Sequence, residues 1–251
     1  MMFKIIGKYN DRGGFAQGKL TYTQPHPKSY HSYTGSFAEN GLFHGPGILT
    51  WNITVEEAAT TEEAVEYEYL SFDGEFKDGK MTSGTMEYRD DSNYTGPFID
   101  EKPHGQGEAD FPENHPSKLT HREGVWKAGK FTKGLMCFAD GKVYNGPVDE
   151  AGEFHGDDCD ITWPPQGFED SRDLVAQFHG SFIHGKATSG RVCYTSKCVY
   201  EGAVNEHFQP HGERGMFTWQ AHNHLKCFLG SFEHGLPVNS SYLYIIYVIY
   251  F

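Results

Sequence analysis

The amino-acid sequence predicts an all-β protein, an elongated single-layer array of about nine stacked antiparallel β-hairpins. Three observations lead to this prediction. Glycine accounts for 30 of 251 residues and aromatic residues for 15% of the chain, a composition that favours strands and tight turns over helices. Two short phrases, each with a period of two residues, alternate along nearly the whole chain. Turn-forming residues separate the two phrases within each copy.

The first phrase is aromatic-x-Gly-x-aromatic, as at residues 72–76 (Phe-Asp-Gly-Glu-Phe). A period of two places the marked residues on one face of a strand. The glycine has no side chain, so the flanking aromatic rings can lie across the backbone. We therefore expect each copy to form the first strand of a hairpin. With looser copies included, nine copies begin near residues 5, 33, 72, 94, 122, 144, 178, 200 and 228.

The second phrase is Gly-x-apolar-x-aromatic, as at residues 84–88, and it predicts the second strand. The fifth copy departs from it, with Asp158 at the expected glycine and one extra residue before Ile161, and the ninth copy loses it after Gly235. Between the phrases lie stretches such as 77–80 (Lys-Asp-Gly-Lys), which are typical of hairpin turns. Because a lone hairpin is marginal in water, stacked neighbours must bury the aromatic row together.

The copies alternate between two kinds. One kind carries a short turn that ends Gly-Lys-x-Thr-x-Gly, in the copies at 72, 122 and 178. The other kind carries a longer turn that ends His-Gly, in the copies at 33, 94, 144 and 200. An insertion follows each long-turn copy, at 52–71, 112–121, 164–177 and 220–227. In a regular stack these insertions emerge from the same edge, which is typical of a binding edge. The first insertion contains six glutamates, and we expect a solvated charged loop, a short acidic helix or an interaction loop there.

The repeated unit resembles the MORN repeat (membrane occupation and recognition nexus), in which Tyr-x-Gly-x-Trp is followed by a Gly-Lys turn and then by Gly-x-Gly and an apolar strand. The resemblance predicts a MORN-repeat array at 5–236, followed by an apolar C-terminal tail at 237–251. It implies a non-catalytic scaffold or adaptor within a cytoskeletal or ciliary (axonemal) assembly, where such arrays act as rigid connectors. The family's name implies an alternative, a membrane-associated tether that recognises phospholipid.

A single-layer array leaves one aromatic face as a groove, and such grooves usually bind something. We expect this groove to hold an extended segment or an amphipathic helix of a partner protein. Some of the first-strand aromatics must pack within the sheet, and others should be left for the partner. The groove residues predicted on this basis are Tyr33, Phe37, Phe72, Phe76, Tyr94, Phe98, Trp126, Tyr144, Phe178, Phe182 and Tyr200.

Net charge and motifs restrict the other classes of function. The formal charge of −13 argues against nucleic acid as a partner and weighs against anionic membranes.

The segment 74–80 matches most of a P-loop, but Met81 stands where a Ser or Thr would hold the metal ion. Equivalent histidines in a regular stack would lie about 19 Å apart, too far to share an ion. We therefore expect no cofactor, no metal and no catalytic residues, hence not an enzyme. The four histidines concerned are His44, His104, His155 and His211.

Five scattered cysteines and the lack of a secretory leader favour reduced thiols in a cytoplasmic protein, with the cytoskeleton or a cilium as the expected location. For Cys193 and Cys198 we favour free thiols over a redox pair.

The tail ends in ten apolar or aromatic residues, 242–251, too few to span a bilayer as a helix. Its β-branched and aromatic content favours a strand, and an uncovered strand of this kind invites aggregation. It either folds back to complete the edge left by the ninth copy, or pairs with another chain in an oligomer or assembly contact. The sequence leaves both possibilities open.

Overall fold

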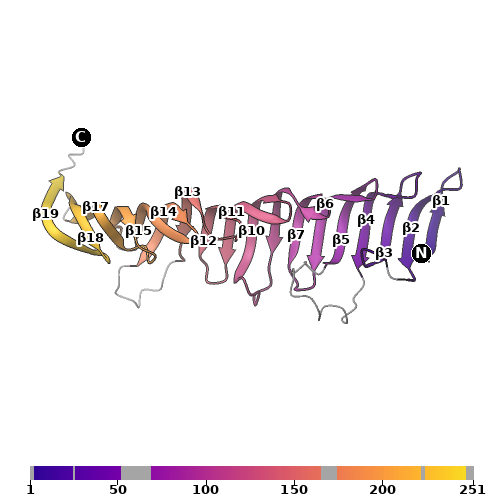
Figure 1. Ribbon diagram of the computed structural model, residues 1–251, viewed down its shortest axis with the longest axis horizontal. Helices are drawn as coiled ribbons and strands as arrows, with labels where there is room; N and C mark the ends of the chain where they lie inside the picture. The colour runs from indigo at the N-terminus through magenta and orange to yellow at the C-terminus, as the bar shows by residue number, and fades with distance from the viewer. Residues whose placement is uncertain (1–2, 25, 52–68, 165–173, 222–223, 247–251) are drawn as a thin grey trace. The chain divides into compact units, whose positions relative to one another are not determined.

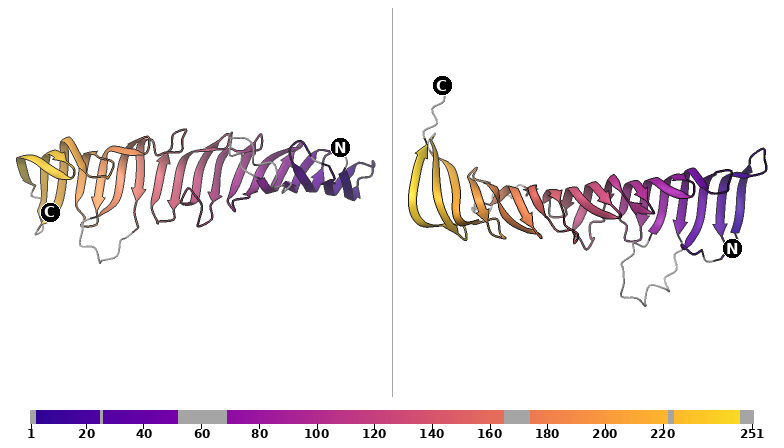
Figure 2. Two further views of the ribbon diagram at one scale, coloured as in Figure 1. Left: turned by 60° about the horizontal axis from the view of Figure 1, so that its bottom comes forward. Right: turned by 45° about the horizontal axis from the view of Figure 1, so that its top comes forward.

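The computed structural model describes residues 3–24, 26–51, 69–164, 174–221 and 224–246. The chain divides into two compact units, Met1–Lys130 and Phe131–Phe251. The described residues form 19 strands, every described pairing is antiparallel, and these ranges contain no helix. Accordingly, no helix among them is long and apolar enough to cross a membrane. The predicted all-β class is confirmed, and in each unit the strands lie side by side in one layer (Figures 1 and 2).

In the first unit each strand pairs with the next along the chain except at β8, since β7 pairs with both β8 and β9. Its strands are β1 (Phe3–Tyr9), β2 (Phe15–Tyr22), β3 (Tyr30–Phe37), β4 (Phe43–Trp51), β5 (Tyr69–Lys77), β6 (Lys80–Tyr88), β7 (Asn93–Ile99), β8 (Lys102–Pro103), β9 (Gly105–Asp110) and β10 (Leu119–Lys127).

The second unit repeats this pattern, starting from a strand whose first residue is the last of the first unit. Its strands are β11 (Lys130–Phe138), β12 (Val143–Pro147), β13 (Gly156–Thr162), β14 (Val175–Ile183), β15 (Lys186–Tyr194), β16 (Val199–Val204), β17 (Pro210–Ala221), β18 (His224–Glu233) and β19 (Leu236–Ile246).

The connections at 52–68 and 111–118 follow β4 and β9, and those at 163–174 and 222–223 follow β13 and β17. In the second unit four strands, β14 to β17, lie between the two connections. In the first unit β5 to β9 lie between them, and β8 and β9 run in the same direction because β7 pairs antiparallel with both. The two connections of each unit therefore leave from the same end of the strands.

The prediction of a shared insertion edge is therefore confirmed within each unit, but the predicted insertions are too long. Residues 69–71, 119–121, 175–177, 220–221 and 224–227 belong to strands, so the fourth predicted insertion is mostly strand. The hairpin turns lie at the opposite edge. The acidic residues predicted to form a loop or helix at 52–68 lie outside the described residues, as do 165–173 and 222–223.

A row of glycines crosses the strands, and the aromatic rings lie over it. Gly35 on β3 pairs with Gly47 on β4, and Gly47 pairs in turn with Gly74 on β5. A Cβ atom added to Gly35 would lie 2.5 Å from the hydroxyl oxygen of Tyr33 and 2.7 Å from the Cα atom of Gly47, closer than real Cβ atoms approach. Glycine is therefore required here by close approach, as the period-two phrases predict. We call the face that carries these rings the inner face.

The two kinds of copy satisfy one backbone carbonyl in two ways. In the long-turn copy at 33, the hydroxyl of Tyr33 donates to the carbonyl of Ser36, three residues on, at 2.9 Å. In the short-turn copy at 72, Phe72 has no hydroxyl, and the equivalent carbonyl of Glu75 accepts from Thr82 at 3.0 Å. This explains why tyrosine accompanies the His-Gly turn and phenylalanine accompanies a threonine after Gly-Lys. The same bonds recur as Tyr94 to Pro97, Tyr144 to Pro147, Tyr200 to Ala203 and Thr188 to Ser181.

Residues in and next to the hairpin turns, at the end of the strands that we call the turn edge, fold over the inner face and cover it. Phe43 stacks on Tyr33 with ring centroids 3.9 Å apart, and Phe154 repeats this contact on Tyr144 at 3.9 Å. Phe208, in the turn between β16 and β17, reaches across to Trp163 beyond the end of β13, with centroids 4.9 Å apart. The inner face is consequently a packed core in the middle of each unit.

The fifth copy corrects one expectation. The residue opposite Gly180 in the glycine row is Cys159, and not Asp158 as predicted. The extra residue forms a β-bulge between Gly156 and Cys159, in which Asp158 has a φ of 59°. The Cys159 thiol accepts a hydrogen bond from the hydroxyl of Tyr144 at 3.3 Å.

Most of the predicted tail completes the last hairpin. β19 pairs with β18 from Leu236 opposite Glu233 to Ile246 opposite Leu225. It runs through the boundary predicted between the array (5–236) and the tail (237–251). The fold-back alternative therefore holds for 236–246, while 247–251 lie outside the described residues.

Candidate functional site

The residues predicted to line an open groove form the core instead. Ten of the eleven are buried, with at most 6% of the side chain and backbone exposed. Phe37 alone among them is half-buried. The rings are covered because the turn edge folds over the inner face, a contact between segments that the two-residue pattern does not encode. The buried ten are Tyr33, Phe72, Phe76, Tyr94, Phe98, Trp126, Tyr144, Phe178, Phe182 and Tyr200.

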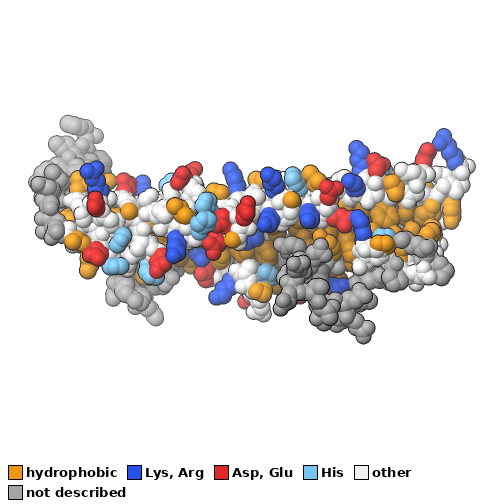
Figure 3. Space-filling model, in the orientation of Figure 1, with side chains coloured by type: hydrophobic (Ala, Val, Ile, Leu, Met, Phe, Trp, Pro, Cys, Tyr) orange, Lys and Arg blue, Asp and Glu red, His pale blue; other side chains and the backbone are white. Residues whose placement is uncertain are grey.

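The aromatic row is accessible at its N-terminal end. Phe37 packs on Phe15 with ring centroids 4.7 Å apart, and Phe15 packs on Tyr9 at 5.5 Å. Phe15 is half-buried, Tyr9 is 63% exposed, and Phe3 on the same face of β1 is 52% exposed. Hydrophobic side chains form a visible band over this part of the first unit (Figure 3). We call the three rings in contact, Tyr9, Phe15 and Phe37, the terminal aromatic cluster; Phe3 lies at the other end of β1, opposite Tyr22.

A second candidate site is built by the turns. In each short turn the two central residues have positive φ, as at Asp78 (50°) and Gly79 (79°), which is the geometry of a type I′ turn. The N–H group of Gly79 donates to the carbonyl of Phe43 in the preceding long turn at 2.8 Å. Every short turn is thus docked on the long turn before it. The equivalent bonds are Gly129 to Pro103, Gly185 to Phe154 and Gly235 to Pro210, at 2.8–2.9 Å.

The four His-Gly histidines are each placed against the first central residue of the next short turn. The Nδ1 atom of His104 accepts from the N–H group of Ala128 at 3.5 Å, and that of His155 accepts from His184 at 3.4 Å. His44 lies 3.8 Å from Asp78, and the rings of His211 and His234 lie 5.5 Å apart. Each of these histidines therefore contacts a residue of the neighbouring short turn. The spacing of about 19 Å between successive His-Gly histidines does not exclude a metal site that such a contact forms.

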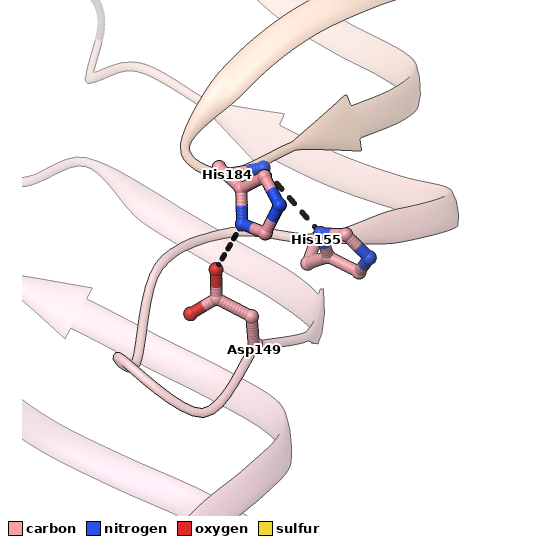
Figure 4. Close-up of side chains that lie close together, drawn as sticks. All are labelled: Asp149, His155 and His184. Atoms are coloured by element: carbon pink, nitrogen blue, oxygen red, sulfur yellow. Dashed lines mark hydrogen bonds and ion pairs between the residues drawn. The ribbon is translucent and has the colours of Figure 1, made fainter.

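One of these contacts brings three metal-ligating side chains together (Figure 4). Asp149 and His155 lie at the two ends of the turn between β12 and β13, and His184 lies in the turn between β14 and β15. One potential ligand atom from each lies within 4.8 Å of the others. The Oδ2 atom of Asp149 is 2.7 Å from Nδ1 of His184. This hydrogen bond, together with those from the N–H groups of Glu153 and Ala151, lowers the pKa of Asp149.

The sequence contained the signal for this cluster. The first central positions of the short turns are residues 78, 128, 184 and 234, and only the last two are histidines. The repeated His-Gly pairs alone do not reveal this cluster, because His184 stands in the other kind of turn. The described cysteines are free thiols, Cys193 and Cys198 among them.

No family model matches the chain, and no curated protein matches its sequence.

Proposed function

We propose that the protein is a non-catalytic scaffold or adaptor of the MORN-repeat type that binds a segment of a partner protein. The observation that carries the proposal is the terminal aromatic cluster, since the rest of the predicted groove is occupied by the chain's own turns. Aromatic side chains are enriched in the cores of protein interfaces, where they supply large contact areas. The proposed location in a cytoskeletal or ciliary assembly is supported by the repeat resemblance.

The free edge of β1 offers a second part of the same surface. Among the described strands β1 pairs only with β2, so its other edge has unpaired N–H and C=O groups. An extended peptide can add to such an edge through its backbone, with alternate side chains on the aromatic cluster. Lys4 and Lys8 lie exposed on β1 and oppose uncontrolled pairing. This arrangement favours an extended partner segment over an amphipathic helix.

The test measures partner affinity in variants of the cluster. Affinity capture of the full chain identifies the partner, and the dissociation constant is then measured with both proteins purified. We expect Tyr9→Ala and Phe37→Ala each to weaken binding by about 30-fold, the size of an interface hot spot. The matched control is Ile99→Ala, which removes an exposed apolar side chain (54%) of the first unit outside the cluster.

Circular dichroism of each variant checks that the array is intact. Equal weakening by Ile99→Ala, or wild-type affinity in both cluster variants, would place the contact outside the terminal aromatic cluster. Flotation with phosphatidylserine-containing vesicles that depends on Tyr9 would replace the scaffold by the membrane-tether alternative.

A further inference from the structure

We propose that Asp149, His155 and His184 form a binding site for one divalent transition-metal ion, with Zn²⁺ as the fitting ion, and that this ion ties two consecutive hairpins together. The inference goes beyond the proposed scaffold function and does not depend on it. It rests on the ligand set, on the distances within the cluster and on a sister turn in the same unit that lacks one ligand.

The ligand set selects the class of ion. Two imidazoles and one carboxylate form a common protein ligand set for Zn²⁺, and a water molecule completes four-coordination. Ca²⁺ and Mg²⁺ prefer ligand sets made of oxygen atoms, so the two histidines do not suit them. Cu²⁺ and Ni²⁺ also bind imidazole, but they differ from Zn²⁺ in their order of affinity and in preferring square-planar or tetragonal geometry to tetrahedral geometry.

The distances are close to those of a tetrahedral site. Bonds of about 2.0–2.1 Å at tetrahedral angles separate ligand atoms by about 3.3 Å. The Oδ2 atom of Asp149 and Nδ1 of His184 are 2.7 Å apart, and one ligand atom of His155 completes a group within 4.8 Å. The ion therefore needs the first pair to open slightly and the third ligand to move closer. His155 has only a long hydrogen bond to give up, the 3.4 Å contact with the N–H group of His184.

The site is held in place before any ion binds. The Oδ1 atom of Asp149 accepts from the N–H groups of Ala151 and Glu153 at 3.0 and 2.9 Å, which leaves Oδ2 facing His184. The Asp149 side chain is only 12% exposed, whereas that of His184 is 69% exposed. Hydrogen bonds that orient a ligating carboxylate strengthen metal binding. The open side at His184 gives the ion access from solvent.

His184 is fixed by the docking of its turn. The N–H group of Gly185 donates to the carbonyl of Phe154 at 2.8 Å, next to His155 in the chain. All three ligands therefore stand on two turns that are hydrogen-bonded to each other. An ion bound there would link β12–β13 to β14–β15 and stabilise that contact.

The next pair of turns in the same unit supplies a natural comparison. There His211 and His234 occupy the positions of His155 and His184, and Asn205 occupies the position of Asp149. The Oδ1 atom of Asn205 accepts from the N–H groups of His207 and Gln209 at 3.0 Å, repeating the bonds of Asp149. The amide lacks the anionic oxygen that Asp149 directs at His184. Asparagine is therefore a structurally tolerated replacement that removes the carboxylate ligand.

The experiment measures Zn²⁺ binding to the purified full chain by competition with a chromophoric chelator. Co²⁺ substitution reports the coordination number through its visible absorption. We expect one tight equivalent of Zn²⁺ in the wild type, and at least tenfold weaker binding in Asp149→Asn and in His184→Ala. Alanine is tolerated at this turn position because Ala128 occupies it naturally with a φ of 49°, against 46° for His184.

The matched control is His234→Ala, which removes the equivalent histidine of the sister turn, where φ is 47°. It should keep the tight equivalent, because the sister turn has no carboxylate. Thermal unfolding adds a readout of the structural role, since Zn²⁺ should raise the Tm of the wild type but not that of Asp149→Asn. Wild-type affinity in Asp149→Asn, or equal loss in His234→Ala and His184→Ala, would overturn the proposal.

Discussion

At the scale of single residues, the array depends on which hydroxyl group donates a hydrogen bond to one backbone carbonyl that recurs in every copy. Tyrosine serves the long-turn copies and threonine the short-turn copies, as Tyr200 with Ala203 and Thr188 with Ser181 illustrate. Both carbonyls lie beside the glycine row, where packing excludes much of the solvent. A buried carbonyl that loses its donor retains the cost of its own desolvation. The hydroxyls therefore have a structural role that the aromatic pattern alone does not reveal.

Removing either hydroxyl should destabilise the fold by a similar amount. We expect Tyr200→Phe and Thr188→Val each to lower the free energy of unfolding by about 1 kcal/mol, because each leaves one carbonyl without its donor. Urea unfolding followed by circular dichroism measures the change. Thr162→Val, at an exposed position of β13, is the control and should have little effect. Unchanged midpoints in both core variants would contradict the structural role of the hydroxyls.

The same tyrosines predict a loss of stability at alkaline pH. Burial raises the pKa of Tyr33 to about 12 and that of Tyr94 to about 12. Because the pKa of these tyrosines is higher in the folded state, their protonated form contributes its full stabilisation of the fold at pH values below the ordinary pKa of about 10. This contribution to the free energy of unfolding is lost as the pH rises from about 10 towards 12. Unfolding measured between pH 8 and pH 12, with tyrosinate absorbance at 295 nm, follows this loss. Tyr33→Phe should be less stable at neutral pH but less sensitive to the rise in pH; equal sensitivity would show that other groups cause the effect.

The sequence identified the glycine row and its aromatics, but it could not distinguish Tyr from Phe in function. That distinction depends on which side chain donates to the carbonyl three residues on, the hydroxyl of the ring itself or a threonine of the next strand, and this contact forms only in the folded hairpin. Nor could the sequence place Cys159 in the row, because a β-bulge at Asp158 shifts the register by one residue. A period-two pattern remains ambiguous wherever one strand gains a residue.

At the scale of elements, the docking of each short turn on the preceding long turn explains how a one-layer sheet obtains a core. The turn supplies a backbone bond, such as Gly129 N–H to the carbonyl of Pro103 at 2.9 Å. The long turn in return places a side chain over the inner face, as Phe43 does on Tyr33. Hairpin turns were predictable from local residues. The contact between turns was not, because it joins segments that only the stacked fold brings together.

The two central positions of one short turn should respond in opposite directions to substitution. Gly129 has a φ of 85°, so Gly129→Ala should cost about 1–2 kcal/mol through left-handed strain. Ala128 has a φ of 49°, so Ala128→Asn should be stabilising, because asparagine is preferred at the first central position of a type I′ turn. Thermal unfolding of the two variants measures both effects. If both changed the Tm in the same direction, the turn assignment would be wrong.

At the scale of the whole molecule, the described pairings join strands that are neighbours in the chain or separated only by the two-residue strand β8. In such repeat arrays stability is the sum of unit terms and nearest-neighbour terms, and the terminal copies need special sequences. The two ends of the chain differ in this respect. At the N-terminus β1 leaves the terminal aromatic cluster exposed, whereas at the C-terminus an 11-residue strand, β19, covers β18. The sequence predicted that something must cover the last hairpin, but it could not decide whether that was the tail or another chain.

Truncation tests the capping role of β19. Removing 236–251 uncovers the edge of β18, which carries the buried side chains of Cys227 and Phe232. Unpaired edges with apolar side chains lead to aggregation, so the truncated chain should unfold at lower temperature and form oligomers or aggregates. Size-exclusion chromatography with light scattering, together with thermal unfolding, measures both changes. Removing only 247–251 is the control and should leave the stability unchanged, because it retains every described pair between β18 and β19. A longer truncation that stays monomeric and equally stable would show that β19 is not needed to cap the array.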